Sequence, residues 1–263
     1  MSTSSANLDT NSLAQTLSKL HQPGNPLVLA NVYDASSARV VASRHPSPTH
    51  AIATASYAVA AAQGIDDDDL TWAQNRTGIA NIVAGIKQAG KWGAVPLTAD
   101  LQDGYDDISA TIHEAIALGV VGANLEDYDA KKKVLRTKEE AVARVKAAVD
   151  AARAAAVPDF VVNARTDLFG FGGTVEDVID RGKAFLEAGA TTVFVWGVGK
   201  YTITEADVRR LVEAFGGKLA VHPGVLGIPL LKQLGVARIS VGPALWRKAM
   251  DVFDVEAVKV MES

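Results

Sequence analysis

Polar side chains that could bind a metal ion or an anion recur along the chain, each at the end of a short apolar run. Asp100, Glu126 and Arg165 are the clearest examples. Carboxylate oxygens suit a hard cation such as Mg²⁺, and the planar guanidinium group of an arginine binds a carboxylate or phosphate at two points. These residue types therefore predict metal-assisted chemistry on a small anionic substrate.

The absence of cysteine restricts this chemistry further. It removes thiolate metal sites and any thiol that could serve as a nucleophile or an acid. His222 and Tyr57 remain as candidates for a general acid or base. For each of them a structural role stays open, because a lone histidine is more often a satisfied core residue and Tyr57 could be a core aromatic.

Composition and charge exclude several classes of protein. The chain has 263 residues, of which 48% are hydrophobic, and a formal net charge of −4. This charge gives no electrostatic reason to expect nucleic acid or an anionic membrane as a partner. No apolar run reaches membrane-spanning length, and the start of the chain lacks the basic and apolar regions of a signal peptide. A cytoplasmic location with no membrane partner is predicted.

The chain repeats a unit of one short strand followed by one longer helix. Apolar or β-branched runs alternate with alanine-rich stretches of helical period, which is typical of a parallel sheet with crossover helices. The predicted strands are Leu27–Asn31, Ala51–Ala55, Ala94–Asp100, Gly122–Glu126, Phe160–Arg165, Thr192–Trp196, Lys218–His222 and Arg238–Val241. Eight units predict an α/β fold of the (β/α)₈ (TIM) barrel type. An open, doubly wound sheet is the alternative, but no G-x-G-x-x-G follows the first strand.

The helices and the chain ends complete this prediction. Helices are expected at Thr137–Ala156 and at Val175–Ala188, where Thr174 can cap the start. A last helix is expected near Pro243–Val260. Residues 1–22 are predicted to form a tail with a short helix near Ser12–Leu20, and residues 23–263 to form a single barrel domain.

Barrel enzymes place their active sites where strands end and loops begin, and the predicted strand ends here are polar. The polar residues at these ends are Asn31, Asp34, Asp100, Gln102, Asp103, Glu126, Asp127, Asn163, Arg165, Asp167 and His222. A single acid at such a position is more often a helix cap or an ion-pair partner. Five strands that end in such groups indicate a site, although not a particular reaction.

At these residues the chain resembles the isocitrate lyase/phosphoenolpyruvate mutase superfamily, from about Leu27 to Trp246. The segments that carry the resemblance are Asn31-Val-Tyr-Asp-Ala-Ser-Ser-Ala38, Ala53-Thr-Ala-Ser-Tyr-Ala58 with Gly64-Ile-Asp66, Val95-Pro-Leu-Thr-Ala-Asp-Leu-Gln-Asp-Gly-Tyr105, Gly122-Ala-Asn-Leu-Glu-Asp127, Asn163-Ala-Arg-Thr-Asp167 and Ala237-Arg-Ile-Ser-Val-Gly-Pro-Ala244. Each segment alone is a weak signal. Six of them in order, at the right strand ends, are specific for the superfamily.

The resemblance implies a role for several residues. Asp100 corresponds to the acid that binds the metal, and Glu126 to the glutamate that holds metal-bound water. The metal implied is Mg²⁺, with Mn²⁺ as the alternative. Substrate contacts are implied for Ser56, Tyr57, Ala58, Asn124 and Arg165, the first two through backbone amides. Asp66 corresponds to the acid of the loop after the second strand, and it and Arg165 are predicted catalytic residues beside Tyr57 and His222.

Departures from the superfamily pattern narrow the reaction. Gln102 replaces the second acid of the Asp-x-Asp motif. The cysteine loop of the lyases is missing, and Trp196 stands where the lyases carry a glutamate after the sixth strand. The loop motif and histidine of the mutases are also missing. Trp196 is therefore expected to form an apolar pocket wall, and Lys131–Lys133 to be either a solvated loop or a mobile lid.

The leading hypothesis is a Mg²⁺-dependent carbon–carbon lyase or decarboxylase that acts on a small 2-oxo or 2-hydroxy dicarboxylic acid through an enolate. Oxaloacetate and a substituted malate are the candidate substrates. Chemistry at a P–C bond, as in the phosphonomutases and phosphonopyruvate hydrolases, is one alternative, and a barrel that binds a 2-oxo acid without catalysis is another. The resemblance also implies a homodimer or homotetramer that exchanges the helix after the eighth strand.

Overall fold

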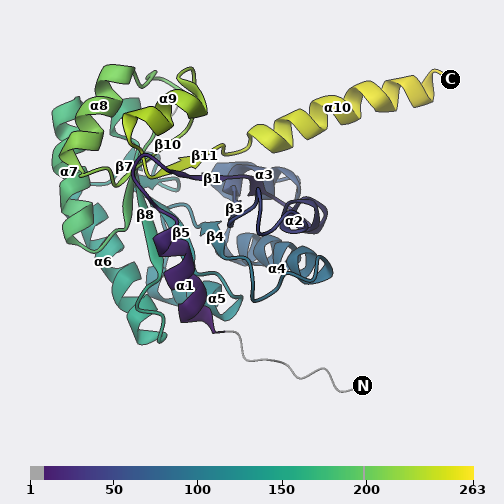
Figure 1. Cartoon of the computed structure of the whole chain (residues 1–263), viewed down its shortest axis with the longest axis horizontal. Coiled ribbons are helices and arrows are strands. Elements are labelled where there is room, and N and C mark those ends of the chain that lie inside the picture. The colour runs from purple at the N-terminus through teal and green to yellow at the C-terminus, as the bar shows by residue number, and fades with distance from the viewer. Residues whose placement is uncertain (1–8, 198) are drawn as a thin grey trace.

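A ring of parallel strands forms the centre of the computed structural model, which describes residues 9–197 and 199–263 (Figure 1). The strands are β1 (Leu27–Leu29), β2 (Asn31–Val32), β3 (Ile52–Thr54), β4 (Leu97–Asp100), β5 (Gly122–Glu126), β8 (Val161–Thr166), β9 (Thr192–Val195), β10 (Leu219–Val221) and β11 (Arg238–Ser240). Their order is β1-β11-β10-β9-β8-β5-β4-β3-β2, and every neighbouring pair is parallel. Only Ala30 separates β1 from β2, so these two segments close the ring. The predicted (β/α)₈ barrel is confirmed.

Helices follow the strands and, apart from the last one, they cover the outside of the barrel (Figure 1). They are α2 (Ala35–Ala42), α3 (Ser56–Ala61), α4 (Trp72–Gln88), α5 (Ile108–Ala117), α6 (Lys138–Ala154), α7 (Val175–Glu187), α8 (Glu205–Ala214), α9 (Gly227–Leu234) and α10 (Ala244–Met261), with 3₁₀ turns η1 (Asp67–Asp69) and η2 (Leu168–Phe171). Capping boxes at Thr71, Thr137, Thr174 and Thr204 begin four of these helices. A threonine at this position satisfies amide groups that have no partner inside the helix, so the sequence itself places the helix starts.

The two ends of the described chain differ in how they pack. The helix α1 (Thr10–Lys19) lies against the barrel, and its Leu17 is fully buried. The helix α10 instead projects away from the body of the molecule (Figure 1), and each of its residues is exposed or half-buried. Its first turn contacts the barrel, where the ring centroid of Trp246 lies 5.8 Å from that of Tyr57.

Two parts of the structure bear on other predictions. The segment after β5 forms a small antiparallel hairpin of β6 (Tyr128–Asp129) and β7 (Val134–Leu135), which the sequence did not predict.

Residues 1–8 of the predicted tail lie outside the described residues, so the division at residue 22 stays a prediction. None of the helices described is long and apolar enough to cross a membrane, and the cytoplasmic location stays a prediction.

Candidate active site

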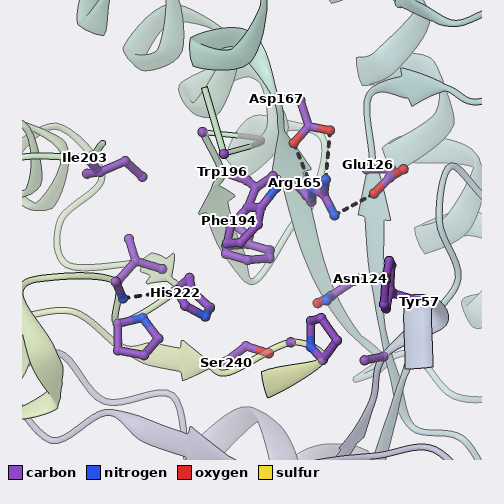
Figure 2. Close-up of a pocket in the computed structure, with 18 of the residues that line it drawn as sticks. Tyr57, Asn124, Glu126, Arg165, Asp167, Phe194, Trp196, Ile203, His222 and Ser240 are labelled. Carbon is purple, nitrogen blue, oxygen red and sulfur yellow. Dashed lines mark hydrogen bonds and ion pairs between the residues drawn. The ribbon is translucent and has the colours of Figure 1, made fainter. Parts of the chain in front are cut away.

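A cavity of about 770 Å³ opens at the carboxyl-terminal ends of the barrel strands (Figure 2). Most of the predicted site residues line it together, although they are far apart in the sequence. Those that do are Ser56, Tyr57, Asp100, Asn124, Glu126, Arg165 and His222. Asp66 and Ala58 are not among the lining residues.

Arg165, at the end of β8, is held between two carboxylates. Its Nη1 atom lies 2.8 Å from Glu126, and its Nε and Nη2 atoms donate to the two oxygens of Asp167 at 2.8 and 3.0 Å. Burial opposes the charge of Arg165, but Asp167 and Glu126 outweigh that effect and raise its pKa. Three of the five N–H groups are used in this way, so two can still be offered to a substrate oxygen.

Both carboxylates beside Arg165 have raised pKa values. Burial raises the pKa of Glu126 well above its usual value, Arg165 opposes the rise, and the charges of Asp167 and Asp100 add to it. Burial likewise raises the pKa of Asp167 although Arg165 contacts it. Acids crowd this end of the cavity, and a bound cation would stabilise their ionised forms.

Asp100, the last residue of β4, is fixed by its backbone and its side chain. Its N–H donates to the hydroxyl of Thr54 at 2.8 Å, and its carbonyl accepts from the amide of Asn75 at 2.9 Å. Its Oδ2 atom accepts from the backbone N–H of Ser56 at 3.0 Å. This rigid setting presents a carboxylate to the cavity at the start of α3.

The loop acids that line the cavity are Asp67 and Asp68, and not the predicted Asp66. Asp66 is exposed and precedes η1, whereas Asp67 and Asp68 of that turn line the cavity. Gln102 fixes Asp67, because its side-chain amide donates to the carbonyl and to Oδ1 of Asp67 at 2.7 and 3.2 Å. Burial and the charge of Asp100 raise the pKa of Asp67 to about 6. The residue that replaces the second acid of the motif therefore positions another acid.

The predicted substrate contacts of α3 also need correction. The N–H of Ser56 is already bonded to Asp100, and the N–H of Ala58 donates to the carbonyl of Ala55 at 3.1 Å. Ala58 is 1% exposed. It therefore has no access to a substrate, since the first turn of α3 uses its amide internally.

A buried polar network lies beneath the cavity, inside the barrel. Asn124 accepts from the amide of Asn163 at 2.6 Å and from Nη2 of Arg238 at 3.2 Å, and Asn163 in turn accepts from Thr192 at 2.6 Å. Arg238 is 1% exposed, and its Nε atom has no hydrogen-bond partner. The network fixes the side chain of Asn124, which lines the cavity.

The two candidates for proton transfer, His222 and Tyr57, differ in their hydrogen bonding and exposure. The Nδ1 atom of His222 accepts from the N–H of Gly224 at 3.0 Å. Burial lowers the pKa of His222, and a backbone hydrogen bond to Val241 opposes that fall. This geometry favours a neutral histidine in the cavity wall. Tyr57 is 40% exposed and lines the cavity, which keeps it as a candidate.

The oxygen donors fit a divalent cation that takes few ligands from the protein. Within residues 9–197 and 199–263, no group of three or more His, Asp or Glu side chains could by itself hold a metal ion. Asp100 offers one carboxylate, and its charge raises the pKa values of both Asp67 and Glu126. Water and substrate oxygens would complete the shell, as is usual for Mg²⁺.

Several other polar strand ends prove to be structural. Asp34 caps α2, and Asp127 forms a buried ion pair of 2.6 Å with Arg181. Asp103 pairs with Arg136. Lys131 is exposed and pairs with Asp106 at 2.6 Å, beside a second, smaller cavity.

Sequence reasoning missed three features of the site. Asp67 was not singled out, although it directly follows the predicted Asp66 in the sequence. Arg238 was placed in a predicted strand without a role, and a charged residue there is a signal that could have been used. Arg247 also lines the cavity, and its guanidinium carbon lies 5.1 Å above the ring of Tyr57.

Comparisons with known proteins agree with the barrel fold. The family model described as phosphoenolpyruvate phosphomutase matches residues 17–261. A Burkholderia cenocepacia J2315 structure, whose assignment as a phosphonomutase is itself provisional, is 33% identical; the superposition has a TM-score of 0.83 and covers 95% of this chain and 99% of that one. The resemblance that the sequence motifs indicated is confirmed.

Two curated relatives match over a shorter length. The 2-methylisocitrate lyase of Shewanella oneidensis is 35% identical over 46% of this chain and 41% of its own. The 2,3-dimethylmalate lyase of Eubacterium barkeri is 32% identical over 53% of this chain and 47% of its own. The matches thus span less than half the length of either relative.

Proposed function

Because this chain belongs to the phosphoenolpyruvate phosphomutase family, we propose that it is a lyase or decarboxylase that cleaves a carbon–carbon bond in a 2-oxo or 2-hydroxy dicarboxylic acid. The observation that carries the proposal is the placement of Asp100, Glu126 and Arg165 around one cavity. A relative named 2,3-dimethylmalate lyase supports a substituted malate as one substrate type. Oxaloacetate is the simplest 2-oxo acid of the class.

Mg²⁺ is the proposed cofactor, with Mn²⁺ as the alternative, and Asp100 is its proposed ligand. Asp67 and Glu126 would hold the water molecules around it. When bound, the cation would act as a Lewis acid that stabilises negative charge on a substrate oxygen. It would also offset the crowding of carboxylates that raises the pKa values of Asp67 and Glu126.

The chain's own residues then have separate tasks. The two unused N–H groups of Arg165 would donate to a substrate carboxylate, and Asn124 would orient the substrate from below. In a decarboxylation, the carbon–carbon bond to the distal carboxylate breaks and carbon dioxide leaves. The electron pair of the broken bond stays on the substrate and forms the enolate. A proton must afterwards reach the substrate carbon, and the hydroxyl of Tyr57, a residue that lines the cavity, is the proposed donor.

Oxalate binding followed by calorimetry tests the proposal, because oxalate mimics a 2-oxo acid enolate. We expect binding that requires Mg²⁺ and that falls at least 100-fold in Asp100→Asn. The matched control is Asp106→Asn, an exposed acid outside the main cavity, which should bind oxalate as the unmodified protein does. Absence of Mg²⁺-dependent binding in the unmodified protein would contradict the proposal and favour a non-catalytic barrel.

A substrate panel follows from a positive result. Release of carbon dioxide from oxaloacetate above the Mg²⁺ background, or of a 2-oxo acid from a substituted malate, would identify the cleaved bond. Release of phosphate from phosphonopyruvate would instead favour chemistry at a P–C bond. Tyr57→Phe should lower kcat more than it weakens oxalate binding if its hydroxyl supplies the proton.

We also propose that a second copy of this chain packs its α10 helix against the barrel surface that carries Val28 and Val40. Val28 on β1 is 41% exposed, although it lies on a barrel strand, and Val40 of α2 is 61% exposed. The α10 helix exposes large apolar side chains such as Phe253, at 69%. Exposed apolar area of this kind marks an interface.

Light scattering at micromolar concentration tests this assembly. We expect a mass of two or four chains for the unmodified protein and a lower mass for Phe253→Glu, which places a charge in the proposed interface. A monomeric mass for the unmodified protein would contradict it.

A further inference from the structure

The cavity continues from the acidic residues into a part with apolar walls. We call this part the apolar compartment, and define it by Phe194, Trp196, Ile203, Val221 and Leu226, all of which line the cavity. In Figure 2, Ile203 appears on the opposite side of the cavity from Glu126, with Phe194 and Trp196 between them. The cavity thus has a charged end and an apolar end.

Trp196 joins these two ends. The guanidinium carbon of Arg165 lies 5.6 Å from the centroid of the Trp196 ring. On the other side, the ring centroids of Phe194 and His222 lie 6.0 and 5.2 Å from that of Trp196. A group attached to a substrate that is held by Arg165 would therefore meet the indole first.

The volume exceeds what a four-carbon acid needs. At roughly 30 Å³ for each water molecule, the cavity of 770 Å³ would hold about 25 molecules. A four-carbon dicarboxylic acid would displace only a minor part of them. Cavities of this size with mainly apolar walls and a few polar groups suit larger organic ligands.

Of the cations that line the cavity, Arg165 lies beside Trp196 but already pairs with the carboxylates of Glu126 and Asp167. Lys200 and Arg247 are exposed, and each lies over an aromatic ring, at 5.3 Å from Phe171 and 5.1 Å from Tyr57. His222 has its Nδ1 atom bonded to the backbone of Gly224. The apolar compartment therefore offers burial to a hydrocarbon group and gives little reason for a second anionic group to enter.

We infer that the substrate carries a large alkyl or aryl substituent on the carbon next to its 2-oxo or 2-hydroxy group, and that this substituent occupies the apolar compartment. The inference rests on the proposed function, because that function places the acid group of the substrate at Arg165 and Asp100. It extends the proposed substrate class from small dicarboxylic acids to ones with a large hydrocarbon side group.

A series of stable 2-oxo acids tests the inference by binding alone. Pyruvate, 2-oxobutanoate, 2-oxopentanoate and 2-oxohexanoate are compared by calorimetry in the presence of Mg²⁺. Each buried methylene should strengthen binding about fourfold, so 2-oxohexanoate should bind roughly fiftyfold more tightly than pyruvate. A gain of tenfold or more supports the inference, and a smaller gain overturns it.

Variants that fill the apolar compartment locate the effect. Ile203→Trp should remove the gain with chain length, whereas Ile203→Leu, which keeps the side-chain volume, should retain it. Leu226→Trp gives a second way to fill the space if Ile203→Trp does not fold, as judged by circular dichroism. A chain-length gain that persists in a folded variant with the space filled would overturn the assignment to this compartment.

The oxalate experiment separates this inference from the proposed function. Mg²⁺-dependent oxalate binding together with a flat chain-length series would leave the function standing and overturn the inference. A chain-length gain that Ile203→Trp removes, without any oxalate binding, would support the apolar compartment and overturn the proposed chemistry.

Discussion

Lowering the pH should destabilise the protein through one buried histidine, His21, which follows α1. The side chain is 9% exposed, and its Nδ1 atom lies 2.8 Å from the carbonyl of Leu17, to which it donates. Its Nε2 atom lies 3.5 Å from Nη1 of Arg238, a cation that can only donate. The contact with Arg238 requires a neutral ring, because Nε2 must accept there, whereas the hydrogen bond to Leu17 forms with a neutral or a charged ring.

The size of the effect follows from proton linkage. Burial, followed by the charge of Arg238, lowers the pKa of His21 to about 3, whereas an unfolded histidine has a pKa near 6.5. Above pH 6.5 neither state binds the proton, so the full stability is present. Below it only the unfolded chain does, so stability falls. Between about pH 7.5 and pH 5.0 the loss is about 2 kcal/mol.

Urea unfolding at the two pH values measures this loss in the unmodified protein and in His21→Gln. The glutamine can donate and accept without binding a proton, so the variant should lose about 2 kcal/mol less on acidification. The matched control is His113→Gln at an exposed position of α5, which should keep the dependence of the unmodified protein. Equal pH dependence in His21→Gln and the unmodified protein would refute the buried, neutral state of His21.

Other substitutions test the remaining polar and packing features by urea unfolding. Arg238→Met removes a buried charge, so the free energy of unfolding should stay within about 1 kcal/mol of the original or rise. Catalytic efficiency should fall roughly tenfold, because Asn124 loses a hydrogen-bond donor. Unchanged efficiency would contradict the role of Arg238 in positioning Asn124. Asp127→Ala should cost about 3–5 kcal/mol by leaving Arg181 unpaired, and adding Arg181→Met should recover part of it. Gly85→Ala would place a Cβ atom 2.1 Å from a backbone carbonyl oxygen at the start of α2. The free energy of unfolding should therefore fall by about 1–3 kcal/mol or more. A variant as stable as the unmodified protein would contradict the close packing of α2 on α4.

The strand-and-helix repeat and the acids at its strand ends could be predicted from the sequence. Gly122–Glu126 is a strand with the predicted bounds, and the capping threonine at Thr174 begins α7 as expected. These features depend on local periodicity and on side chains that reach only a few residues along the chain. Since strand ends of a barrel meet at one face, the positions of Asp100, Glu126 and Arg165 at strand ends were enough to assign them to one site.

Only the tertiary structure decided which neighbours of these residues matter. The choice of Asp67 over Asp66 depends on Gln102, which lies on another loop and fixes η1. Arg238 meets His21 across 217 positions of sequence, and no local pattern reports such a contact. The apolar compartment likewise forms between segments that follow different strands. Local propensity sets which elements form, whereas side-chain direction and burial are set by packing between distant segments.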